Sequence, residues 1–120
     1  MLIRIVCAGL AGAAFLVALS NQEERGKDLF VRRCSGCHAA DVNKEGPRLR
    51  GVFGRKAAAV ADFNYSDALK KTGVRWDEAT LDRWLTDPDA MVRDTDMAFR
   101  LKDAEERKSV IAYLKTLKNP

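Results

Sequence analysis

The sequence predicts an all-α protein with long loops, and three observations support that class. Four stretches carry apolar residues at the three- and four-residue spacing of an amphipathic helix, whereas no stretch alternates apolar and polar residues as a half-buried strand would. Each stretch opens with a side chain that commonly caps a helix. The connecting segments are long, and long loops in a small domain are commonly functional. We therefore expect three main helices and one short helix, wrapped around a bound group.

The first twenty residues differ from the rest of the chain. One early cation, Arg4, precedes an uninterrupted apolar run from Ile5 to Leu19, which is shorter than the roughly 20 residues that span a bilayer. A cationic start, a short apolar middle and small residues at the exit are typical of a secretory signal peptide. We predict a signal peptide at residues 1–20, cleaved near Ser20–Asn21, and a mature domain at 21–120. The alternative is an uncleaved membrane anchor.

The first two expected helices flank a long loop over 38–64. The first begins at Asn21, a good N-cap residue, with Glu24 at the position that completes a capping box. The second is short, with Ser66 as its N-cap and Gly73 as its terminating residue.

The last two expected helices flank a second loop over 87–102. Asp77 caps the first of them and Pro88 ends it, while Asp103 caps the last helix with Glu106 at the box position. Each has an apolar face at helical spacing, formed by Leu81, Trp84 and Leu85 and by Val110, Ile111, Leu114 and Leu117.

The composition is that of one globular domain. The chain has 120 residues, of which 47% are hydrophobic and 32% are charged. The formal net charge is +4, from 21 Lys and Arg against 17 Asp and Glu, and the basic residues form no block. A nucleic-acid-binding surface would need such a block, so we expect no nucleic-acid partner.

Cys34-Ser35-Gly36-Cys37-His38 is a C-x-x-C-H motif, the attachment signature of c-type haem. Two thiols on one helical turn can each bond a haem vinyl group, and the adjacent histidine can reach the iron from the same side. Such attachment takes place outside the cytoplasm, in agreement with the predicted leader. We therefore predict one haem c, bound through Cys34 and Cys37, with His38 as an axial ligand of the iron.

Three other interpretations of the two cysteines are weaker. A thioredoxin-like pair needs a βαβ context, and the sequence shows no strands. A structural zinc site needs about four ligands, whereas the mature chain offers two cysteines and one histidine. A plain disulfide would leave His38 and the long loops unexplained.

The second axial ligand has two candidates. No other histidine exists, so methionine is the natural donor, and the mature chain contains Met91 and Met97. A lone methionine more often fills a core. Both residues lie in the second loop, however, where an exposed methionine needs a reason.

Further motifs follow one another along the chain in a recognisable order. They are Gly26 with Phe30, the stretch G-P-R-L-R-G-V-F-G-R-K at 46–56, F-N-Y-S-D-A at 63–68, G-V-R-W at 73–76, and matches in 106–115. Together with the haem motif they resemble the class I cytochromes c, of the mitochondrial and bacterial c2 type, over nearly the whole mature chain. The resemblance implies the cytochrome c fold, with the first and last helices crossing at Gly26. It also selects Met97 as the second ligand, nine residues after Pro88.

The resemblance assigns roles to further residues. The Pro47 carbonyl is expected to accept the second ring N–H of His38. A haem propionate is expected to be neutralised or hydrogen-bonded by Arg55, Tyr65 and Trp76. Thr95 and Phe99 are expected to pack beside Met97.

Several positions depart from the family pattern. Leu69 stands where asparagine is common and Trp84 where tyrosine is common, so we expect a drier methionine-side pocket with fewer hydrogen bonds. Arg93-Asp94 replaces a Pro-Gly pair, which loosens the turn. Asp89, Asp96 and Asp103 stand where cations are frequent, so we expect weaker steering toward strongly acidic partners.

These observations predict a soluble, monomeric single-haem electron carrier in the periplasm, with no enzymatic turnover. Its donor and acceptor would be membrane redox complexes or other redox proteins, of the respiratory or photosynthetic type. One alternative is a peroxidase-like haem enzyme or gas binder with an open iron site. Another is a bound electron-transfer subunit of a dehydrogenase or oxidase. A form anchored by its leader is a third.

Overall fold

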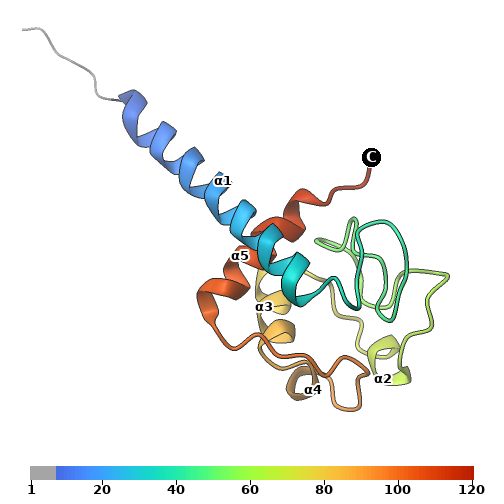
Figure 1. Ribbon diagram of the computed structural model, residues 1–120. Helices are drawn as coiled ribbons and strands as arrows, with labels where there is room; N and C mark the ends of the chain where they lie inside the picture. The colour runs from blue at the N-terminus through green and yellow to red at the C-terminus, as the bar shows by residue number, and fades with distance from the viewer. Residues whose placement is uncertain (1–7) are drawn as a thin grey trace, which may run out of the picture.

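The computed structural model describes residues 8–120, and this part of the chain is helical (Figure 1). Three helices are long: α1 (Ala8–Arg33), α3 (Glu78–Thr86) and α5 (Ala104–Thr116). Two are single turns: α2 (Asp67–Lys70) and α4 (Pro88–Met91). Within 8–120 the only strand-like pairing is one antiparallel bridge between Lys56 and Arg75. The all-α prediction is confirmed. Arg4, the cation of the predicted leader, lies outside the described residues.

Helices α1 and α5 cross at Gly26 (Figure 1). A Cβ placed on Gly26 would lie 1.8 Å from the backbone oxygen of Ser109, so no other residue permits this approach. Beside the crossing, Phe30 packs on Tyr113 with ring centroids 5.4 Å apart. The predicted crossing point is therefore present.

The prediction that the first helix begins at Asn21 is wrong for the full chain. Helix α1 starts at Ala8 and runs through Asn21 without a break, because alanine and leucine of the apolar run are good helix formers and nothing interrupts them. The N-terminal half of α1 projects away from the domain (Figure 1), and the side chains of 12–20 are exposed. None of the helices within 8–120 is both long and apolar enough to cross a membrane.

The remaining caps follow local chemistry. Ser66, Asp77 and Asp103 each accept a backbone N–H at the start of α2, α3 and α5, as predicted. The second loop is less irregular than predicted because Asp87-Pro88 begins α4, with the Asp87 side chain accepting from Ala90 N at 3.3 Å. Helix α2 ends at Lys70, before Gly73, which instead takes a positive φ of 64° in the following turn.

The two long loops complete the wall around the core. Backbone hydrogen bonds fix the middle of the first loop: Gly51 N donates to Leu117 O at 2.6 Å, and Ala57 N donates to Val74 O at 2.7 Å. The second connects α4 to α5. Leu101 near its end is 2% exposed, and its N–H donates to Leu85 O at 2.7 Å. This arrangement places Pro47 of the first loop and Met97 of the second loop at the same cavity.

Candidate functional site

A cavity of about 620 Å³ lies between the helices and the two loops. This volume is in the range of small-molecule sites. All of the site residues predicted from the sequence line it: Cys34, Cys37, His38, Pro47, Arg55, Tyr65, Trp76, Thr95, Met97 and Phe99. Met91, the other candidate ligand, lines a separate small surface pocket with Arg83 and Thr86.

The C-x-x-C-H motif continues the last turn of α1. Cys34 N donates to Phe30 O at 2.8 Å, and His38 N donates to Cys34 O at 2.9 Å. This turn brings both thiols and the imidazole to the cavity. Cys34 is half-buried and Cys37 is exposed, and both are free thiols.

His38 is held by the first loop from its outer side. Its Nδ1 lies 2.9 Å from the Pro47 carbonyl oxygen, as predicted. Because a carbonyl can only accept, Nδ1 carries the proton and Nε2 is the atom that can bind a metal. A Cβ on Gly46 would lie 2.2 Å from His38 Cε1, so the ring position requires glycine there. Burial lowers the pKa of His38, which keeps the imidazole in its neutral, metal-binding form.

Before haem attachment, both cysteine thiols have raised pKa values. Burial raises the pKa of Cys34 to about 11. The pKa of Cys37 is also raised, mainly by its hydrogen bond to the Glu45 carboxylate at 3.5 Å. Among residues 8–120, no group of three or more His, Cys, Asp or Glu side chains could hold a metal ion. The zinc interpretation therefore has no support in this part of the chain.

The methionine side of the cavity differs from our expectation. Trp84 Nε1 donates to Met97 Sδ at 3.2 Å, and the indole of Trp84 packs on Trp76 with centroids 5.2 Å apart. Tryptophan in place of tyrosine therefore keeps a donor to the sulfur, and the expected loss of this hydrogen bond is wrong. Leu69 is buried, which leaves that part of the pocket apolar as expected. Phe99 stacks under the Arg33 guanidinium at 5.5 Å.

The polar end of the cavity contains a cation with no acidic partner. Arg55 is half-buried and donates to the carbonyls of Arg50 and Arg48 at 3.3 and 3.1 Å. No carboxylate of the described residues forms an ion pair with it. Burial lowers its pKa, which reflects the cost of a desolvated cation. An anionic ligand group in the cavity would offset that cost, so the residues fit a haem with its propionate at this end.

Tyr65 also lines the cavity, and its hydroxyl forms one hydrogen bond within the protein. The hydroxyl oxygen accepts from Val60 N at 3.2 Å, which leaves its own proton available to a ligand. Trp76 is buried at 7% exposure.

Some lining residues were not identified as site residues from the sequence. Leu81, Leu85, Val110 and Leu114 were assigned to the helix core, yet they face the cavity as well. Their spacing cannot separate the two roles, because a helix presents the same apolar face to a neighbour or to a cofactor. One property of the sequence could have indicated the contact from Trp84 to Met97, because a buried indole N–H needs an acceptor.

A helical domain whose first helix runs into C-x-x-C-H, and whose cavity holds an imidazole and a thioether, defines the class of proteins that bind haem covalently. Comparison with known proteins agrees. A family model described as Cytochrome c matches residues 23–118. The chain belongs to the cytochrome c family. It therefore binds one covalently attached haem c and carries electrons, and it is not an enzyme.

Individual relatives cover most of the chain. Cytochrome c2 iso-2 of Magnetospirillum molischianum is 44% identical over 88 residues, which are 71% of this chain and 91% of the relative. Cytochrome c of Arabidopsis thaliana is 39% identical over 102 residues, covering 82% and 91%. The solved structure of cytochrome cH from Methylobacterium extorquens has a TM-score of 0.74 and 44% identity, covering 78% of this chain and 97% of that one.

Proposed function

We propose that this protein is an exported, monomeric electron carrier whose haem is attached through Cys34 and Cys37 and whose iron is ligated by His38 and Met97. One observation carries the proposal: an imidazole and a thioether line the same cavity, and each is oriented by a hydrogen bond with another residue, His38 to Pro47 and Met97 from Trp84. The bound haem supplies a single-electron couple. With His38 and Met97 both bound to the iron, no position would be left for a substrate.

The polar end of the cavity is proposed to hold a propionate. Arg55 provides the charge, and Tyr65 and Trp76 provide hydrogen-bond donors. Thr95 and Phe99 are proposed to pack beside the ligand sulfur. Because Cys37 is exposed, a haem attached to it would approach the surface on that side, and electrons would enter and leave there.

The location and partners are part of the same proposal. We place the carrier in the periplasm, with residues 1–20 as a cleaved signal peptide and 21–120 as the mature domain. Exposure of the side chains of 12–20 supports this division, because their removal would cost the domain no packing. The donors and acceptors would be membrane redox complexes or other redox proteins.

The contacts of the methionine loop support a closed iron site over an open one. Asp94 has a positive φ of 66°, in the turn where Arg93-Asp94 replaces Pro-Gly. Its N–H donates to Asp89 Oδ1 at 3.1 Å, which ties the turn to α4. The predicted loosening is thus counteracted by a local hydrogen bond.

The test is an absorption spectrum of the oxidised and reduced holoprotein, repeated with added carbon monoxide and with Met97→Ala. We expect the wild type to show the weak red band of an iron–sulfur(Met) bond and to ignore carbon monoxide. The variant should lose the band and bind carbon monoxide. A wild type without the band that binds carbon monoxide would show an open iron and refute Met97 as the ligand.

A further inference from the structure

The segment that carries Met97 is weakly held along its middle. No backbone hydrogen bond joins Thr95–Arg100 to any other residue within 8–120. Side-chain contacts hold it instead: the bond from Trp84 to Met97, the packing of Phe99 on the core and under Arg33, and an ion pair between Arg100 and Asp87. Both side chains of the ion pair reach solvent. Exposed ion pairs contribute little. The position of Met97 therefore depends strongly on how the two ends of the segment are fixed.

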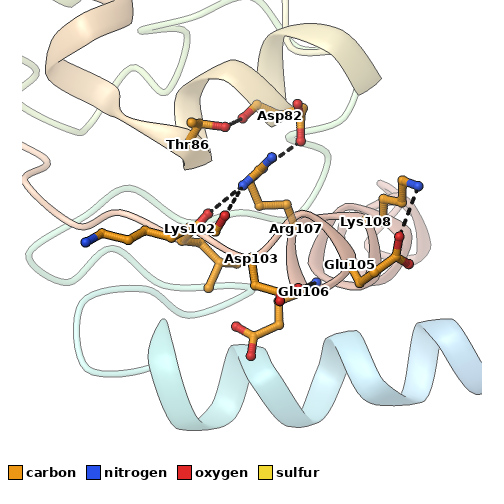
Figure 2. Close-up of polar contacts among 9 residues, drawn as sticks. Asp82, Thr86, Lys102, Asp103, Glu105, Glu106, Arg107 and Lys108 are labelled. Carbon is orange, nitrogen blue, oxygen red and sulfur yellow. Dashed lines mark hydrogen bonds and ion pairs between the residues drawn. The ribbon is translucent and has the colours of Figure 1, made fainter.

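Arg107 fixes the C-terminal end (Figure 2). This residue lies in the first turns of α5, and its side chain is 11% exposed. Its Nη1 donates to the backbone oxygens of Leu101 and Lys102 at 3.0 and 2.8 Å. Its Nε donates to Asp82 Oδ1 on α3 at 2.8 Å. One guanidinium thus joins α5, α3 and the end of the Met97 segment.

We propose that Arg107 is a positioning residue for Met97: it holds the end of the segment so that the thioether stays on the cavity. This inference rests on the proposed function, in which Met97 is the iron ligand. The geometry requires arginine, because a planar guanidinium donates to two carbonyls and one carboxylate at once. A lysine ammonium at this position would keep the positive charge but lose the planar arrangement of donors that reaches all three acceptors.

The chain offers a matched control. Lys115 of α5 forms an ion pair with Glu78 of α3, so it joins the same two helices. Lys115 has no hydrogen bond to the Met97 segment. A loss of helix–helix contact alone would affect both sites, whereas a loss of ligand positioning would affect only Arg107.

The experiment compares the wild-type holoprotein with Arg107→Lys and Lys115→Gln by titrating the ferric protein with imidazole. Imidazole replaces the methionine sulfur and removes the red band. We expect Arg107→Lys to bind imidazole roughly tenfold more tightly than the wild type, the equivalent of one charge-assisted hydrogen bond. We expect Lys115→Gln to stay within about twofold of the wild type.

Equal imidazole affinities in Arg107→Lys and the wild type, or equal increases in both variants, would overturn the positioning role. If Arg107→Lys yields no folded holoprotein, Asp82→Asn serves as the test. It leaves the carbonyl contacts and removes the charge that orients the guanidinium, so its imidazole affinity should exceed that of Lys115→Gln, and equality would overturn the proposal. A wild type that binds imidazole as readily as Met97→Ala would instead refute Met97 as the ligand, and the positioning role with it.

Discussion

With Met97 as the proposed iron ligand, its sulfur is the atom whose surroundings would most affect the electron couple. Trp84 donates an N–H to it at 3.2 Å from a buried position on α3. A donor withdraws electron density from the sulfur, so a sulfur bound to the iron would donate less to the ferric state and favour the ferrous state.

Trp84→Phe should therefore lower the reduction potential. A hydrogen bond of about 1 kcal/mol corresponds to on the order of 40 mV for a one-electron couple. A redox titration measures the shift. Trp84→Tyr keeps a donor and is the control. A potential in Trp84→Phe at or above that of Trp84→Tyr would contradict this account of the sulfur.

The position of the His38 ring, the proposed iron ligand, requires glycine at residue 46. An alanine Cβ would lie 2.2 Å from the His38 ring, so the imidazole would have to move and lose its bond to Pro47. We expect Gly46→Ala to destabilise the holoprotein by roughly 2 kcal/mol, as overpacking does, in denaturant unfolding. Gly36→Ala is the control, because no atom lies within 4 Å of its Cβ position. Equal stabilities of the two variants would contradict the steric argument.

The sequence predicted the His38 side better than the Met97 side. His38, Pro47 and the two cysteines are fixed by contiguous motifs whose geometry is local. The neighbours of Met97 come from α3, and which face of α3 meets the loop depends on packing that spacing alone does not determine. The donor at Trp84 was missed for that reason.

At the scale of elements, capping residues predicted where helices begin better than they predicted where one helix continues or is interrupted. Asp77 and Asp103 begin helices because their carboxylates accept backbone N–H groups. Asn21 has the same preference and caps nothing here, since a cap forms only where the preceding chain leaves the helix. Asp87-Pro88 both ends α3 and begins α4, and a pattern that stops one helix also starts the next.

The cap of α3 should show in the pH dependence of stability. Hydrogen bonds from Thr80 lower the pKa of Asp77 below its ordinary value of 3.8. A lowered pKa in the folded state means that the cap stabilises above about pH 3.8 and loses this effect as the pH falls through the folded pKa. Asp77→Ala should lower the melting temperature by a few degrees at pH 7, and by less at pH 2.

Asp77→Asn separates the two effects, because it keeps a capping oxygen without a charge. It should melt between the wild type and Asp77→Ala at pH 7. A deficit in Asp77→Ala that is the same at both pH values would contradict a cap that depends on ionisation.

For the whole molecule, the cofactor is part of the core. The cavity of about 620 Å³ has a largely apolar lining, and without haem this lining would be exposed to water instead of packed. We expect Cys34→Ser with Cys37→Ser, prepared without haem, to lack a cooperative thermal transition by circular dichroism. A melt close to that of the holoprotein would refute this dependence.

The charges at the cavity opening are of both signs. Arg33, Glu45 and Asp96 line the cavity and are exposed, although the chain has a net charge of +4. Electron exchange with hexacyanoferrate, a small anion, should therefore slow by less than about threefold between low and physiological ionic strength. Asp96→Lys should increase both the rate and its salt dependence. A steep salt dependence in the wild type would contradict an opening whose charges largely offset one another.

The two fixed ends of the Met97 segment also affect how well dissolved small ligands could compete with Met97 for the iron. A ligand on a flexible tether competes at an effective concentration in the millimolar range, and restricting the tether raises that value. With Val92 buried at one end and Leu101 held at the other, the proposed thioether ligand would be presented to the iron at a high local concentration. A weak donor such as a thioether can then outcompete stronger small ligands in the surrounding solution, because each of them must arrive by diffusion while the sulfur is already there.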